Sequence, residues 1–182
     1  MLMKDYFNLR KSKLLLFVLL AVLAGGVSPA WANELTICDG SSTNQYVPIY
    51  GFYADTPGSK SEFIVPKNLL EDMEGGTVTS MNFYLSTKPS AAWKATWEVF
   101  MREVDDENYS STTFLDKGEN STVVYTGVLD ATTGVMTVSF SNNFVYSGEK
   151  NLLVGVYMTT KGSNYPKATF IGEEHPSSCA FQ

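Results

Sequence analysis

The feature that most constrains the fold of this chain is a recurring alternation of apolar and polar side chains with a period of two residues. It occurs in residues 78–86, 96–104 and 136–140. Successive side chains of a β-strand point to opposite faces, so each segment predicts a strand with one face on a core and one in water. The apolar positions are Met81, Phe83 and Leu85, then Trp97, Val99 and Met101, then Met136, Val138 and Phe140.

Other segments extend this pattern into a complete all-β fold. Residues 152–157 are continuously apolar, which is typical of a central strand covered on both faces. The absence of helices alternating with the roughly nine expected strands excludes a parallel α/β sheet and favours an antiparallel β-sandwich. The shorter candidate strands lie at residues 35–38, 47–53, 62–65, 122–129 and 168–171.

One short helix is expected between these strands. Pro66 suits a first helical position, and Gly75-Gly76 suits a left-handed cap at the end of the helix. The helix is expected to cover one end of the core. Its apolar face would consist of Leu69, Leu70 and Met73.

Residues 1–32 carry the pattern of a secretory signal peptide. A basic opening precedes the apolar run 14–23, and Ala30-Trp31-Ala32 offers the small residues that a signal peptidase accepts. The apolar run has about half the length of a membrane span. We therefore expect a single mature domain over residues 33–182 that has no stable membrane span and is secreted, periplasmic or associated with the cell surface.

The charge of the mature chain limits its partners. Removal of residues 1–32 leaves nine basic and eighteen acidic residues, a net charge of −9. So few scattered basic residues form no surface for phosphate backbones or anionic lipid, which argues against nucleic acid as a partner.

Cys38 and Cys179 are the only cysteines, and they lie near the two ends of the mature domain. Export permits a disulfide, and the termini of domains often lie close together. Two separate thiols are the alternative, because the separation of the two Cα atoms cannot be read from the sequence.

The strand segments also resemble a known family. The chain contains, in order, VTSMNFYL at 78–85, WEVFMREV at 97–104, VYTG at 124–127, FVY at 144–146 and NLLVGVY at 151–157. This series covers most of the mature chain. It resembles jelly-roll modules, of the galactose-binding-like or cleaved-adhesin kind, found in exported surface proteins of Gram-negative anaerobes, often beside fibronectin type III domains.

The resemblance implies a β-sandwich of jelly-roll type and a role at the cell surface. Its motifs belong to strand cores, so they transfer no ligand residues. Such proteins usually continue into further modules, whereas this chain ends at Gln182. We therefore expect either a free-standing module or one that is truncated at the C-terminus.

Aromatic residues outside the predicted core strands are candidate ligand contacts. Tyr50 and Tyr53 lie in a segment crowded with aromatic residues, and Trp93 lies in a polar loop. Exposed tyrosine and tryptophan side chains can stack on sugar rings or anchor a protein partner. The alternative for Trp93 is a buried position over the core.

Acidic residues after the strand 96–104 suggest two further kinds of site. Glu103 and Glu107 flank Asp105 in an E-x-D-x-E spacing, which resembles the carboxylate signature of jelly-roll β-glucanases. Asp106 interrupts the apolar positions of that signature, which favours a loop. In such a loop Asp105, Asp106 and Glu107 are candidate Ca²⁺ ligands, and a solvated turn is the alternative.

His175 is the only histidine, and it lies near the C-terminal end of the chain. No nucleophile motif accompanies it, so we expect a surface loop position. One histidine and two distant cysteines do not supply a four-ligand zinc site with the usual spacing. Apart from structural Ca²⁺, we expect no cofactor.

These observations favour an exported, non-enzymatic binding or adhesion module that recognises a glycan or a surface protein. Two other functions remain open. One is a small glycoside hydrolase that uses Glu103 and Glu107, and the other is a purely structural module of a surface assembly.

Overall fold

The computed structural model describes residues 34–38, 40–51, 58–110, 113–175 and 177–182. The chain divides into two units, Met1–Glu34 and Leu35–Gln182, and all the strands belong to the second. The predicted signal peptide lies outside the described residues. Within the described ranges, no helix has both the length and the apolar character that crossing a membrane would require.

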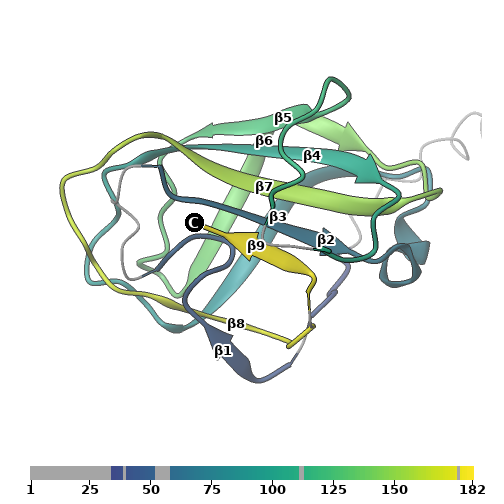
Figure 1. The fold of residues 1–182 in the computed structure, drawn as a ribbon. Helices are drawn as coiled ribbons and strands as arrows, with labels where there is room; N and C mark the ends of the chain where they lie inside the picture. Colours follow the sequence, from purple (N-terminus) through teal and green to yellow (C-terminus); the bar gives the residue numbers. More distant parts are fainter. Residues whose placement is uncertain (1–33, 39, 52–57, 111–112, 176) are drawn as a thin grey trace, which may run out of the picture. The chain divides into compact units, whose positions relative to one another are not determined.

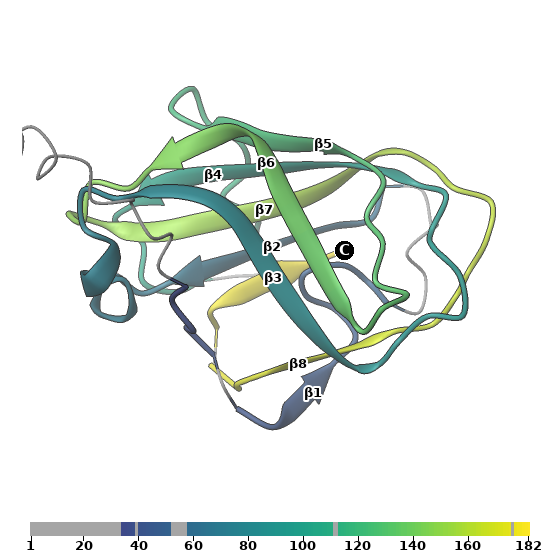
Figure 2. The ribbon, with the colours of Figure 1, turned by 180° about the vertical axis from the view of Figure 1, so that it is seen from behind.

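The strands form two antiparallel sheets that face each other (Figures 1 and 2). The four-stranded sheet has the order β1 (Ser42–Asn44), β8 (Thr169–Gly172), β3 (Thr77–Thr87) and β6 (Val135–Val145). The five-stranded sheet has the order β5 (Thr122–Gly127), β4 (Thr96–Val104), β7 (Asn151–Thr160), β2 (Lys60–Val65) and β9 (Cys179–Phe181).

This strand order confirms the predicted fold class. The orders β1-β8-β3-β6 and β5-β4-β7-β2 are those of an eight-stranded jelly roll, to which β9 adds an edge strand. All strand pairs are antiparallel. The molecule is therefore an all-β sandwich of jelly-roll type.

The apolar positions of the alternating segments form the core between the two sheets. On β4, Trp97 and Val99 are fully buried, and Met136 and Val138 of β6 meet them from the opposite sheet. Exposed polar residues alternate with the half-buried apolar side chains of β3. The period of two therefore identified the buried face of each strand.

A second apolar cluster covers the outer face of the five-stranded sheet. Phe100 and Leu153 are fully buried there, although they point away from the core between the sheets. Tyr109 and Phe114, from the loop between β4 and β5, pack over them. Because β7 is covered on both faces, its first six residues are all buried, which agrees with the continuous apolar run in the sequence.

The predicted short helix is wrong in kind, because the structure has two consecutive 3₁₀ turns, Lys67–Leu69 and Glu71–Met73. A segment this short gains too few α-helical hydrogen bonds to offset helix nucleation, and 3₁₀ turns are common in such short pieces. Leu70 is fully buried, and Gly75 has the expected left-handed conformation, with φ of 67°.

Two predicted strands do not form in the described residues, at 35–38 and 47–51. In the second segment the side chain of Asn44 accepts hydrogen bonds from the backbone N–H groups of Tyr46 (3.0 Å) and Val47 (2.8 Å). A side chain that bonds the backbone in this way turns the chain and competes with a strand ladder.

Gly155 of β7 provides a test of the packing on the outer face. It pairs with Phe100 of β4, whose ring fills the space that a Cβ atom at position 155 would occupy. We expect Gly155→Ala to lower the free energy of unfolding by about 1–3 kcal/mol, the usual effect of overpacking a core. Denaturant titration followed by tryptophan fluorescence would measure it.

The matched control is Gly172→Ala in β8, where nothing lies within 4 Å of the added carbon. The control should stay within about 0.5 kcal/mol of the unsubstituted protein. Equal effects of the two substitutions would contradict the packing described for Phe100.

Candidate functional site

Trp93 is not available as a ligand contact, and this prediction is corrected. Its side chain is 1% exposed, and its indole Nε1 donates a hydrogen bond to the carbonyl oxygen of Pro166 at 2.8 Å. Asn164 links the same two loops, since its side chain accepts from the Lys94 N–H and donates to the Ala92 carbonyl. Trp93 therefore covers one part of the core, which is the alternative that the sequence left open for this residue.

Tyr50 belongs to a half-exposed aromatic cluster formed by Tyr46, Tyr50 and Phe181. The rings of Tyr46 and Phe181 are stacked, with centroids 4.3 Å apart and planes 17° apart, and the Tyr50 ring lies 5.3 Å from that of Tyr46. Phe181, on the edge strand β9, is 49% exposed. Tyr53, the other predicted contact, lies outside the described residues.

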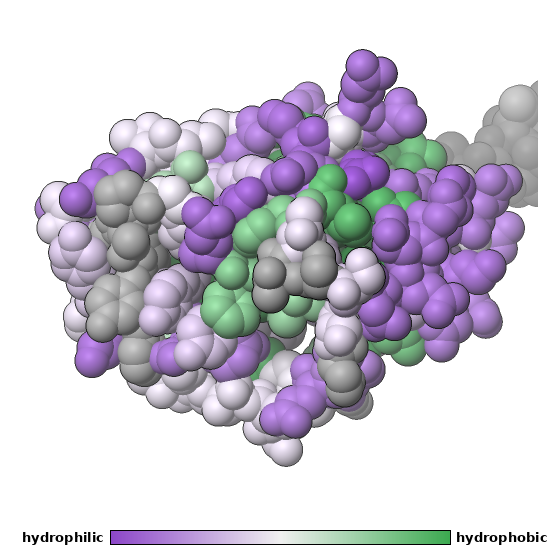
Figure 3. Space-filling view, viewed as in Figure 1, coloured by the Kyte–Doolittle hydropathy of each residue, from purple (hydrophilic) through white to green (hydrophobic). Residues whose placement is uncertain are grey.

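Phe181 projects from the face of β9 opposite to Ala180, because successive side chains of a strand alternate and Ala180 packs in the apolar cluster on the outer face. Figure 3, in the view of Figure 1, shows apolar surface over the middle of the molecule, with hydrophilic surface on either side of it. Gln45 adds a polar group at the cluster, because its side-chain amide donates a hydrogen bond to the Tyr46 hydroxyl at 2.9 Å. The cluster thus combines aromatic rings with hydrogen-bonding groups.

The acidic segment after β4 does not gather into a site. Asp105 forms an ion pair with Lys150 at 2.8 Å, and the backbone carbonyl of Asp106 accepts a hydrogen bond from the Asn151 side chain. Asp105, Asp106 and Glu107 are all exposed. Among the described acidic, histidine and cysteine residues, these three are not brought within coordinating distance of one another, so the predicted Ca²⁺ ligands do not converge.

Glu103 has a structural partner at the end of β4. Both of its carboxylate oxygens accept hydrogen bonds from Ser147, one from the backbone N–H at 2.8 Å and one from the hydroxyl. This contact fastens the turn between β6 and β7 to β4. Glu103, one of the two carboxylates expected in a hydrolase, thus forms hydrogen bonds that stabilise the β6–β7 turn.

Cys38 and Cys179 are not joined in a disulfide, so of the two alternatives that the sequence left open, the structure has two separate thiols. Both residues are exposed. Cys179 begins β9, at the edge of the five-stranded sheet, whereas Cys38 precedes β1, at the edge of the other sheet. The two cysteines therefore belong to segments that pair with different strands.

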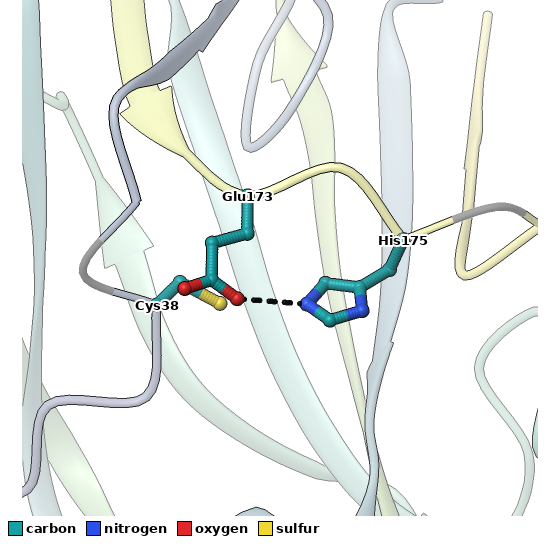
Figure 4. Close-up of side chains that lie close together, drawn as sticks. All are labelled: Cys38, Glu173 and His175. Carbon is teal, nitrogen blue, oxygen red and sulfur yellow. Dashed lines mark hydrogen bonds and ion pairs between the residues drawn. The ribbon is translucent and has the colours of Figure 1, made fainter.

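Cys38 instead lies beside Glu173 and His175, which follow β8 (Figure 4). One Cys Sγ atom, one carboxylate oxygen and one imidazole nitrogen of these residues lie within 4.8 Å of one another. The Nε2 atom of His175 is 3.1 Å from Glu173 Oε2. His175 is exposed in a loop, as expected, but no sequence pattern indicated that Cys38 and Glu173 would lie beside it.

A buried carboxylate, Glu62 of β2, was not predicted at all. It is 0% exposed and accepts four hydrogen bonds on the outer face of the five-stranded sheet. The four donors are the Tyr109 hydroxyl (3.1 Å), the Leu115 N–H (2.8 Å), the Asp116 N–H (2.9 Å) and the Tyr157 hydroxyl. A buried charge is tolerated when its acceptor positions are filled in this way.

The residues around Glu62 form a continuous network. The Nζ atom of Lys60 is 3.1 Å from Asp116 Oδ1 and lies 3.9 Å from the centre of the Phe114 ring. Arg102 donates a hydrogen bond to the Leu115 carbonyl at 3.0 Å. The hydrogen bonds to Glu62 fill acceptor positions of its carboxylate and connect the β4–β5 loop to β2.

Burial and the neighbouring Glu62 carboxylate raise the pKa of both Tyr109 and Tyr157 well above the usual value for tyrosine. For Tyr157, Asp116 adds to this effect, because it accepts a hydrogen bond from the same hydroxyl at 3.0 Å. Both hydroxyls therefore remain protonated donors to Glu62.

Comparison with models of protein families, with curated proteins and with solved structures finds no match to this chain.

The Glu62 network can be tested by the substitution Glu62→Gln. The substitution replaces one carboxylate oxygen by an NH₂ group. This group would face hydrogen-bond donors that the oxygen accepts from in the unsubstituted protein. Since hydrogen bonds to charged groups contribute about 1.5–3 kcal/mol, we expect the free energy of unfolding to fall by at least this amount. Chemical denaturation followed by circular dichroism would measure the change.

Glu98→Gln is the matched control on the same sheet. Glu98 forms an ion pair with Lys117 at 2.7 Å, and both side chains reach solvent. The control should change stability by less than about 1 kcal/mol. A Glu62→Gln protein as stable as this control would show that the network does not hold the loop.

The two tyrosines also predict a loss of stability in alkali. Above about pH 10, the unfolded chain releases tyrosine protons that Tyr109 and Tyr157 retain in the folded state. The unfolded state then binds fewer protons, so the free energy of unfolding falls by up to about 1.4 kcal/mol per pH unit for each tyrosine. Below about pH 9 both states keep these protons, and the two groups contribute no slope.

Denaturation curves between about pH 8.5 and pH 11 would measure this slope. In Tyr109→Phe the slope should be shallower, because one of the two shifted groups is absent. Identical slopes for the variant and the unsubstituted protein would contradict the assignment.

Proposed function

We propose that the mature chain is an exported, non-enzymatic binding module that recognises a carbohydrate through the aromatic cluster. The observation that carries this proposal is the half-exposed ring of Phe181, stacked on Tyr46 at the edge of the five-stranded sheet. The exposed part of an aromatic ring can stack on the C–H face of a sugar ring, and the neighbouring hydroxyl and amide groups can form hydrogen bonds with the sugar hydroxyls. Export rests on the signal-peptide pattern of residues 1–32.

Charge also supports a neutral ligand. The expected mature chain has a net charge of −9, which disfavours phosphate-rich partners and acidic polymers. The aromatic cluster itself includes hydrogen-bonding groups but no charged side chain. A neutral glycan avoids the repulsion that an anionic one would meet.

The arrangement of Glu103 favours binding over hydrolysis. A glycoside hydrolase of the usual type needs two carboxyl groups that face the scissile bond, one of them as the proton donor. Both oxygens of Glu103 accept hydrogen bonds from Ser147, and Glu107, the second carboxylate of the predicted hydrolase, is exposed in the loop after β4. A non-enzymatic module is therefore the better account of this segment.

A glycan array probed with the mature chain would test the proposal. We expect binding to at least one neutral glycan, and a loss of about tenfold or more in affinity for Tyr46→Ala and Tyr50→Ala, since aromatic contacts of this kind carry much of the binding energy. Both side chains are partly exposed, so each variant should keep the fold, and circular dichroism would verify this.

Tyr165→Ala is the matched control, because Tyr165 is a 53% exposed tyrosine outside the aromatic cluster. It should leave glycan binding unchanged. Failure to bind any glycan, equal affinity in Tyr46→Ala, or release of sugar from a bound glycan would each overturn the proposal. Trp93→Ala is unsuitable as a probe, because removing a buried tryptophan costs about 3–5 kcal/mol of stability.

A further inference from the structure

We propose that Cys38, Glu173 and His175 form a binding site for a zinc ion. These residues supply a sulfur, an oxygen and a nitrogen atom that lie within 4.8 Å of one another. In Figure 4 the sulfur of Cys38 and the ring of His175 both lie beside the Glu173 carboxylate. This site is separate from the aromatic cluster and does not depend on the proposed glycan binding.

Strand pairing explains how residues so distant in sequence come together. In the β1–β8 pair, Ser42 lies opposite Gly172, and the strands run antiparallel. The residues just before Ser42 therefore continue beside the residues just after Gly172. This register brings Cys38 to the loop that contains Glu173 and His175.

The local backbone leaves room for the Glu173 side chain. A Cβ atom at Gly40 would collide with Glu173 Cγ and would lie 2.8 Å from the carbonyl oxygen of Gly172. Glycine at position 40 thus allows the two segments to approach closely. On the other side of the site, the His175 carbonyl accepts hydrogen bonds from the Ser178 hydroxyl (2.8 Å) and N–H (3.3 Å), which fix the loop that carries the imidazole.

The set of donor atoms favours zinc over other common ions. Ca²⁺ and Mg²⁺ take oxygen ligands, whereas Zn²⁺ readily combines thiolate, imidazole and carboxylate. Ligand atoms around a tetrahedral zinc ion lie about 3.5 Å apart, given bonds of about 2.0–2.3 Å. The side chains are exposed, so small rotations suffice to reach this arrangement. Three protein ligands leave a fourth position for water.

The sequence did not suggest this set of residues, because one histidine and two distant cysteines lack the usual spacing of a four-ligand zinc site. The structure instead adds a carboxylate, Glu173, two residues before His175. The result is a set of three ligands that does not use Cys179.

Titration of the reduced mature chain with Co²⁺ would test the site, because Co²⁺ reports its ligands by absorption. We expect a thiolate-to-cobalt charge-transfer band, visible bands typical of tetrahedral cobalt, and loss of both on addition of Zn²⁺. Cys38→Ser should abolish the charge-transfer band. His175→Ala and Glu173→Gln should weaken binding by at least about 10–100-fold, the loss that even an outer-shell partner of a metal can cause.

Cys179→Ser is the matched control, since it removes the other cysteine and keeps all three proposed ligands. It should bind Co²⁺ like the unsubstituted protein. No charge-transfer band in the unsubstituted chain, an unchanged band in Cys38→Ser, unchanged affinity in His175→Ala, or loss of the band in Cys179→Ser would each overturn the proposal. Because the substituted side chains are exposed, the variants should fold normally, and circular dichroism would verify this.

Discussion

The buried carboxylate of Glu62 is the interaction on which the outer layer of this sandwich depends. Its four hydrogen bonds reach Tyr157 on β7 and three residues of the β4–β5 loop. These bonds help to hold the loop over the sheet, where Tyr109 and Phe114 cover Phe100 and Leu153. A polar contact therefore supports the apolar cover of β7. Burying a carboxylate is costly, and here four hydrogen bonds to the Glu62 oxygens offset that cost.

The sequence was sufficient to predict the inner core because that core depends on a periodic property. The segment 96–104 was predicted with the bounds that β4 has, and the apolar run at 152–157 lies within β7. The outer layer has no such periodicity. Glu62 meets donors 47 to 95 residues further along the chain, so a charged residue within a strand was the only local signal of its role.

The two strands that sequence patterns missed, β1 and β9, are three-residue strands at sheet edges. Segments this short have no measurable alternation, and their conformation comes from the neighbour that they pair with. These two strands nevertheless position residues of the aromatic cluster and of the proposed zinc site. Strand β9 holds Phe181 against Tyr46, and β1 directs Cys38 toward His175. The site predictions for Trp93 and Glu103 were based on residue type alone. In the structure both side chains form hydrogen bonds within the fold, which the residue type does not reveal.

In a jelly roll, functional residues usually lie at sheet edges and in loops, because many side chains of the strands are needed for apolar packing. In this chain residues 151–156 of β7 are buried, with apolar clusters on both faces of the sheet, so this part of β7 offers no surface to a ligand. At the other end of that sheet, Ser141 and Asn142 of β6 donate hydrogen bonds to the Val124 and Val123 carbonyls of β5, so part of that edge is bonded within the fold. The aromatic rings and the proposed metal ligands instead meet solvent near the β1 and β9 edges.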